Sequence, residues 1–247
     1  MPGRRLCRLE ALLAAGSPRM KHITFYLDFI SPYAYLAFEN LPEALKGLSY
    51  SVSYRPVLFA GLLKHHGQLG PAEIPAKRDW TYRQVLWLAH REGISLQMPA
   101  SHPFNPLQLL RLAVACGAAE NAHGLYTGSE LVAVNRYVCE NIFRHVWQGG
   151  AEATDPQRLE MLRHQLALQL RMPPEAAKHG LKRNTDDAIS RGLFGVPAFE
   201  VDGKVFWGLD ALPMLRQFLE GHPWFQSAAW SEATQLPMGI QRSRPGA

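Results

Sequence analysis

The order of strand and helix signals along the chain constrains its fold more than any other feature. Residues 22–30 are aromatic and β-branched and residues 49–55 alternate, which predicts two strands with a helix between them. The stretches that follow show helical spacing, at 77–92, 106–120, 128–147, 156–171 and 174–191. Two short strands joined by a tight turn, at 198–201 and 204–207, then precede a last helix. The sequence therefore predicts βαβ and ββα units that share one sheet and are separated by helices.

An α/β protein with this order of elements has a thioredoxin-like fold (βαβ…ββα) with a large all-helical insertion. We expect the thioredoxin-like domain to comprise residues 21–75 and 192–222, and the helical insertion subdomain to comprise residues 76–191. A chain of 247 residues can bury roughly 70–75% of its unfolded surface, so the fold needs no metal or disulfide to hold it together.

The two ends of the chain differ from the body. Residues 1–20 combine a basic start with a short apolar run that Glu10 adjoins, which is too short for the core of a signal peptide. We interpret this segment as a disordered or mis-assigned extension, with translation starting at Met20. Residues 223–247 are polar and contain Pro and Gly, so we expect them to form a C-terminal tail.

Charge and hydropathy exclude two classes of partner. The net charge is +5, but residues 1–20 contribute +3 and residues 221–247 contribute +1, which leaves +1 for the body. No stripe of Lys and Arg with interleaved aromatic residues is present, so we expect no nucleic-acid partner. No stretch approaches the ~18 uninterrupted apolar residues of a transmembrane helix, so we expect no membrane partner.

The cysteine and histidine patterns argue against disulfides and metals. The three cysteines, Cys7, Cys116 and Cys139, form no C-x-x-C pair, which supports neither a disulfide framework nor a zinc site. The last two lie in apolar helical patterns and are expected to be small core residues. This usage is typical of a reducing compartment, and we expect a cytoplasmic location. The sequence has no H-E-x-x-H motif or close His/carboxylate cluster, so no metal site is expected.

Ser31 is the candidate catalytic residue because it ends the first strand and begins the next helix, with Pro32 behind it. Redox proteins of this fold place C-x-x-C here, whereas residues 31–34 of this chain contain no thiol. A hydroxyl that donates to a charged acceptor contributes ~1.5–3 kcal/mol, and a helix N-terminus ~0.3–1 kcal/mol. Together they supply the ~2 kcal/mol that lowers a thiol pKa from ~8.5 to ~7. Ser31 can therefore stabilise a thiolate of another molecule; the alternative is that it only caps the helix.

Two later motifs accompany Ser31. Residues 194–197 (Phe-Gly-Val-Pro) precede the third strand, at the position where thioredoxin-like folds have a cis proline that faces the helix start. Residues 207–210 (Trp-Gly-Leu-Asp) end the fourth strand. Asp210 can cap the last helix or pair with an α-ammonium group of a ligand.

Together, these segments resemble the 2-hydroxychromene-2-carboxylate isomerases and the kappa-class glutathione transferases. The similarity rests on residues 25–37, 194–197 and 206–210 in the same order and covers residues 21–222. The resemblance implies glutathione as a cofactor, with its sulfur near Ser31 and its peptide paired as an added strand with the backbone of Val196, next to Pro197. It also implies that Asp210 holds the γ-glutamyl ammonium. The residues implied to line that end are Trp207, Gly208 and Leu209.

The resemblance implies further contacts and shows some departures. Lys77 corresponds to a lysine that contacts glutathione, or else is a solvated lysine at a helix start. Gln68 stands where the family commonly has Asn, and residues 209–211 (Leu-Asp-Ala) replace its Asn-Asp-Arg or Ser-Asp-Arg, which removes polar contacts. The segment expected to line the acceptor-substrate pocket, or to form only a structural turn, contains His102, Phe104 and Asn105.

Three functions stay open at the level of sequence. The first is a glutathione-dependent isomerase that acts on a small aromatic carboxylate by thiolate addition, bond rotation and elimination. The second is a transferase that couples glutathione to an electrophile. The third is a non-catalytic scaffold that binds a peptide beside Pro197. The resemblance also implies a homodimer.

Overall fold

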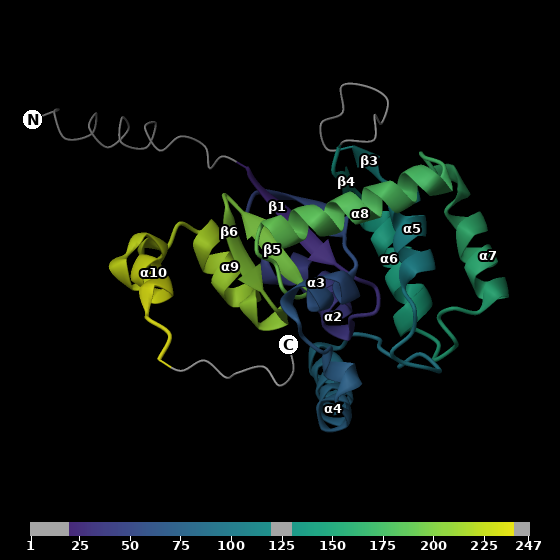
Figure 1. Ribbon diagram of the computed structural model, residues 1–247, viewed down its shortest axis with the longest axis horizontal. Helices are drawn as coiled ribbons and strands as arrows, with labels where there is room; N and C mark the ends of the chain where they lie inside the picture. Colours follow the sequence, from purple (N-terminus) through teal and green to yellow (C-terminus); the bar gives the residue numbers. More distant parts are fainter. Residues whose placement is uncertain (1–19, 120–129, 240–247) are drawn as a thin grey trace, which may run out of the picture.

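A four-stranded mixed sheet forms the centre of the protein, which we describe from a computed structural model covering residues 20–119 and 130–239 (Figure 1). The strand order is β2-β1-β5-β6, with β1 parallel to β2, β5 antiparallel to β1, and β6 antiparallel to β5. The strands are β1 (Lys21–Leu27), β2 (Tyr50–Pro56), β5 (Ala198–Val201) and β6 (Lys204–Trp207). The two halves of the predicted fold, which residues 76–191 separate in sequence, therefore meet between β1 and β5 (Tyr26 opposite Ala198).

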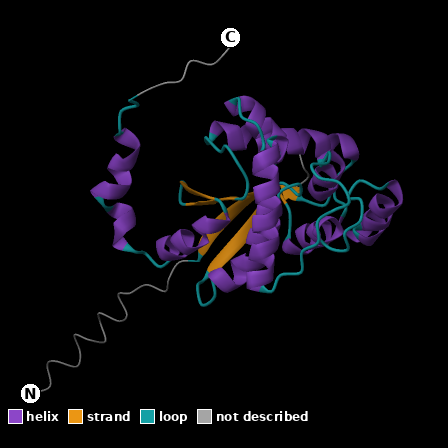
Figure 2. Cartoon of the chain, turned by 90° about the horizontal axis from the view of Figure 1, so that it is seen from below, coloured by secondary structure: helices purple, strands orange, loops and turns teal. Residues whose placement is uncertain are grey.

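Helices cover both faces of this sheet because its strands alternate their apolar side chains (Figure 2). Phe25 points to the face covered by α2 (Pro32–Ala44) and α9 (Leu212–Leu219), and its ring centroid lies 4.6 Å from that of Phe199. The next residue, Tyr26, belongs to a second cluster on the face of α3 (Phe59–His66) and α8 (Pro174–Ser190).

The insertion packs its helices into the same core as the sheet. It contains α4 (Pro75–Glu92), α5 (Leu107–Ala115), α6 (Arg136–Trp147), α7 (Pro156–Gln165) and α8. Phe143 and Trp147 of α6 contact Phe29 and Tyr35 at the end of β1 and the start of α2. In contrast, α4 projects from the body (Figure 1). The predicted thioredoxin-like fold with a helical insertion is confirmed.

Two predicted helices of the insertion are shorter than expected. The helix predicted over 106–120 ends at Ala115, and the one predicted over 128–147 begins at Arg136. Short strands occupy part of the difference, β3 (Ala118–Ala119) and β4 (Val132–Ala133), which pair with each other. The prediction was wrong there because the Asn135 side chain, which accepts from the N–H of Val138 at 2.9 Å, starts the helix.

Other segments differ from the sequence-based expectations or lie outside the described residues. Helix α3 was not predicted, and helices predicted to end at 171 and 191 end at 165 and 190. Residues 223–226 and 228–232 of the expected tail are short helices, and Phe225 is buried against Phe206. Cys116 and Cys139 are buried as expected, whereas Cys7 and the N-terminal extension lie outside the described residues. None of the described helices is both long and apolar enough to cross a bilayer.

Candidate functional site

A cleft of about 710 Å³ lies between α2, α4 and the segment that follows β6. Its volume is within the range of small-molecule sites, ~300–1,000 Å³. Six residues predicted from the sequence line it, namely Val196, Pro197, Trp207, Gly208, Leu209 and Asp210. The remaining lining comes from the two helices and the start of α9, namely Tyr33, Asn40, Glu43, Ala44, Gln84, Leu88, Arg91, Glu92, Leu212 and Pro213. The structure therefore brings both C-terminal motifs to the wall formed by α2.

Ser31 has the position and the hydrogen bonds of a helix N-cap. Its backbone is extended, and its hydroxyl oxygen accepts from the N–H of Ala34 at 3.2 Å. The residue is 7% exposed. Because the oxygen serves as the acceptor in this cap, the hydroxyl proton stays available for a second partner. Ser31 is not among the residues that line the cleft, but Tyr33 is, and the Tyr33 hydroxyl donates to Oε1 of Gln84 at 2.6 Å.

The segment before β5 presents unpaired backbone to the cleft. The Val196–Pro197 peptide bond is cis, as predicted. Neither the N–H nor the C=O of Val196 has a hydrogen-bond partner in the part of the chain that the structure describes, whereas the Pro197 carbonyl accepts from the N–H of Gly208 at 2.9 Å. Gly195 packs so closely on the Trp207 indole that a Cβ would overlap it. The two motifs therefore form one unit with a free strand edge.

Asp210 does not cap the last helix. Helix α9 begins at Leu212 after Ala211 and has no side-chain cap. The Asp210 carboxylate instead folds back over Gly208, which has a φ of 101° and no room for a Cβ. Asp210 is exposed in the cleft and accepts no hydrogen bond from a described residue. The capping alternative is wrong, and the carboxylate is available to a ligand.

The other predicted site residues do not line the cleft. Lys77 and Gln68 are exposed, at the first turn of α4 and just after α3. The side chain of Asn105 accepts from the N–H of Leu107 at 3.0 Å in the turn before α5, whose N-cap, Pro106, makes no side-chain hydrogen bond. Phe104 packs on the core and lies near His102. Their expected contacts with glutathione or substrate stay predictions.

Two charged residues near the site were not predicted. Asp28 is fully buried, and burial raises its pKa to about 7, opposed by hydrogen bonds from the N–H groups of Phe59 and Ile30. Arg91 is the one cation among the described residues that line the cleft, and it pairs with Glu92. Gln84, Leu88 and Arg91 are spaced i, i+4 and i+7, so the helical period could have placed Arg91 on the face of α4 that contributes Gln84.

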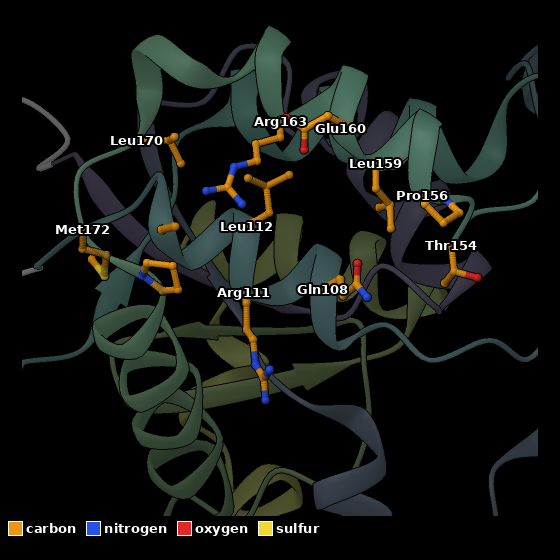
Figure 3. Close-up of a pocket in the computed structure, with 12 residues that line it drawn as sticks. Gln108, Arg111, Leu112, Thr154, Pro156, Leu159, Glu160, Arg163, Leu170 and Met172 are labelled. Carbon is orange, nitrogen blue, oxygen red and sulfur yellow. The ribbon is translucent and has the colours of Figure 1, made fainter.

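A second cavity, of about 450 Å³, lies between α5 and α7 (Figure 3). Its lining is largely apolar and includes Leu112, Leu159 and Met172, with Arg163 directed into it. It contains no residue that the sequence pointed to and shares none with the cleft. Among the described residues, no three His, Cys, Asp or Glu side chains gather as a metal site requires. The α2–α4 cleft is therefore the candidate site.

The chain is similar to proteins of two named kinds. The chain is 29% identical over 224 residues to "Glutathione s-transferase kappa 2" of Caenorhabditis elegans, which covers 82% of this chain and 93% of that protein. It is 26% identical over 209 residues to a 2-hydroxychromene-2-carboxylate isomerase of Sphingobium xenophagum, which covers 81% and 98%. A solved structure of a 2-hydroxychromene-2-carboxylate isomerase has the same fold, with a TM-score of 0.61 and 22% identity over 83% of this chain and 97% of that one.

These relatives confirm the resemblance inferred from the three sequence motifs. The family described as DSBA-like thioredoxin domain matches residues 22–220, which include β1, the whole insertion and α9. The chain belongs to the DSBA-like thioredoxin domain family.

Proposed function

We propose that this protein binds glutathione in the α2–α4 cleft and is a glutathione-dependent isomerase of aromatic acids like 2-hydroxychromene-2-carboxylate. The observation that carries the proposal is the Ser31 hydroxyl at the N-terminus of α2, with a free backbone edge at Val196 and an unpaired carboxylate at Asp210. The curated relatives that share most of their length with this chain are named as such isomerases and as kappa-class glutathione transferases.

The groups that line the cleft match the chemistry of glutathione. The free N–H and C=O of Val196 would pair with the peptide as an added strand. Asp210 would hold the γ-glutamyl ammonium, and Arg91 supplies a cation for the carboxylate on the same carbon. Arg91 would thus replace a cation that the family commonly carries at the position of Ala211. The tripeptide fits a cleft of about 710 Å³.

The role of Ser31 is to keep the sulfur charged. Its proton is free to be donated because the oxygen already accepts from Ala34. A thiolate at the start of α2 would also face the partial positive charge of the helix N-terminus. Glutathione would supply the nucleophile, which adds to an unsaturated carbon of the substrate, lets the former double bond rotate and is eliminated unchanged.

A transferase is the second candidate because relatives named kappa-class glutathione transferases cover as much of the chain as the isomerases do. The same thiolate would then form a stable conjugate with an electrophile. A homodimer and a cytoplasmic location stay predictions from the resemblance and the cysteine usage, as do glutathione contacts of Lys77 and Gln68.

Thermal unfolding with and without glutathione tests the binding. A ligand at a hundred times its Kd adds ~2.7 kcal/mol to the free energy of unfolding, so we expect a rise of several degrees in Tm. An unchanged Tm with 10 mM glutathione (a concentration chosen as roughly a hundred times a ~0.1 mM Kd) would contradict both enzymatic candidates and favour a scaffold.

Chromatography of the products separates the two enzymes. Conversion of a hydroxychromene carboxylate without loss of glutathione supports the isomerase, and a conjugate supports the transferase. Ser31→Ala should lower turnover by ~10²-fold in either case, because the donor to the thiolate is lost. Unchanged turnover would leave Ser31 only its capping role.

A further inference from the structure

The peptide that links Ile30 to Ser31 is held at both ends. The Ser31 N–H donates to the carbonyl of Asp28 at 3.1 Å, and the Ile30 carbonyl lies 2.8 Å from Nε2 of His102. One residue earlier, Nε1 of Trp147 donates to the Phe29 carbonyl at 3.0 Å. His102 and Trp147 both lie in the helical insertion. The insertion therefore holds the turn between β1 and α2 that contains Ser31.

The geometry places a proton on Nε2 of His102. A carbonyl only accepts, so Nε2 carries the proton that reaches Ile30. The Tyr82 hydroxyl lies 2.7 Å from Nδ1 and donates to the backbone carbonyl of His102 at 2.9 Å. The ring is part-buried between Tyr82, Phe104 and Trp147. Burial lowers the pKa of His102, although the hydrogen bond to Ile30 opposes this, which favours the neutral ring.

Both ring nitrogens of His102 are therefore used by the protein itself, which leaves none for a substrate. For stability alone, any backbone N–H could donate to the carbonyl of this turn. Here the donor to the Ile30 carbonyl is instead an imidazole that lies 72 residues away in the sequence. That carbonyl and the Ser31 N–H belong to one rigid peptide plane. The Ser31 carbonyl on the other side accepts from the N–H of Tyr35 at 3.2 Å, so that holding this plane as well fixes the direction in which the Ser31 side chain leaves the backbone.

We propose that His102 is a positioning residue for Ser31, whose Nε2–H holds the Ile30–Ser31 peptide so that the Ser31 hydroxyl points at the sulfur of bound glutathione. The effect on the sulfur rests on the proposed function. The hydrogen bond from His102 to the Ile30 carbonyl, which we call the tether, is present in the protein without ligand. A displacement of well under 1 Å at a donor is enough to weaken a charged hydrogen bond, which is why the tether matters for the thiolate.

Three variants separate positioning from simple packing. His102→Phe keeps an aromatic ring but removes both nitrogens, and His102→Gln keeps an N–H close to the place of Nε2. His145→Phe is the matched control, because His145 is also a part-buried histidine of the insertion whose Nε2 bonds a carbonyl, that of Ala153 at 2.9 Å. Tm is measured for each variant, so that a general loss of stability is recognised.

Hydrogen exchange of the Ser31 amide tests the tether without ligand. We expect exchange at least ~10-fold faster in His102→Phe, and close to wild type in His102→Gln and His145→Phe. Equal exchange in wild type and His102→Phe would overturn the inference, whatever glutathione does.

The pKa of bound glutathione tests the consequence. Titration of thiolate absorbance near 240 nm should show a pKa about one unit higher in His102→Phe, hence turnover ~10-fold lower at neutral pH and recovering as pH rises. His102→Gln should restore most of the shift, and His145→Phe should not move it. If the pKa of the glutathione thiol is unchanged in His102→Phe although the Ser31 amide exchanges faster, His102 has only a structural role and the inference is overturned. If the wild-type protein binds no glutathione, the proposed function is wrong.

Discussion

The two helices that form the walls of the cleft are held in different ways. Helix α2 buries seven of its 13 residues, in the core beneath the sheet and against α6. Helix α4 is longer, with 18 residues, yet only Val85 and Ala89 are buried. Each begins with a proline, but Ser31 caps α2 with its side chain, whereas Ile74 provides α4 with no such bond. Extensive packing therefore holds α2 in place. Helix α4 is held by a narrow contact, which we call the seam, between Leu36 of α2 and its own Val85 and Ala89.

The two helices therefore have different roles in the proposed site. The wall that must place a hydroxyl accurately is the one that packs most of its residues into the core. The wall that presents Gln84 and Arg91 is largely exposed, and these side chains would contact the charged end of the proposed ligand rather than its sulfur. The predictions below test this contrast.

The seam between the walls should carry the largest effect on stability. Leu36 of α2 is fully buried against Val85 and Ala89 of α4. Leu36→Ala would leave a cavity there, so we expect the free energy of unfolding to fall by ~2–5 kcal/mol. Urea unfolding measures it, with the exposed Leu86→Ala of α4 as control. A loss no greater than that of the control would mean that the seam is not a packed contact.

Asp28, just before α2, should make the free energy of unfolding depend on pH. Asp28 has a pKa of about 7 in the folded protein, raised by burial above the ~3.9 expected in the unfolded chain. The unfolded chain therefore releases this proton first, and the free energy of unfolding falls as pH rises from ~4 to ~7, by at most ~4 kcal/mol, and then levels off. Urea midpoints across this range in wild type and Asp28→Asn check it; a slope that survives in Asp28→Asn has another source.

The exposed wall should affect affinity rather than chemistry. Arg91→Gln removes the cation of the cleft, so we expect Kd for glutathione to rise by ~10-fold with turnover at saturation unchanged. Calorimetry with glutathione and with an analogue that lacks the γ-glutamyl carboxylate gives the comparison, because the analogue should bind both proteins alike. Equal losses with both compounds would assign Arg91 a role other than holding that carboxylate.

The smallest effect is expected one turn earlier on α4. Trp87 is 56% exposed, and the Arg91 guanidinium lies 5.0 Å from its ring centroid. Trp87→Ala should lower the free energy of unfolding by less than ~1 kcal/mol and weaken glutathione binding only ~2–3-fold, through loss of this cation–π contact. In the Arg91→Gln background Trp87→Ala should have no further effect on Kd; an additive loss would show that Trp87 acts independently.

Much of this protein is determined by signals that act over a few residues. Apolar periodicity, the Ser31-Pro32 helix start and the turn before β6 are local, so the fold and most of its elements, though not α3, β3 or β4, could be predicted from the sequence. The motifs at 194–197 and 207–210 are local too, and Val196 and Pro197 of the first line one cleft with all four residues of the second. The ends of α5 and α6 were misjudged because pairing of β3 with β4 overrides helical propensity there.

Only the tertiary structure decided which distant side chains surround these motifs. The sequence offers no sign that His102 and Trp147 reach the carbonyls of residues 30 and 29 or that Asp28 is fully buried, and helical spacing places Arg91 on the face of Gln84 without showing that a cleft lies beside that face. Hydrogen bonds between elements far apart in the chain, and the loss of water that shifts a pKa, arise only when the helices pack on the sheet. Local propensity determined most of the helices and strands. Packing determined which distant side chains bond to one another and which pKa values are shifted.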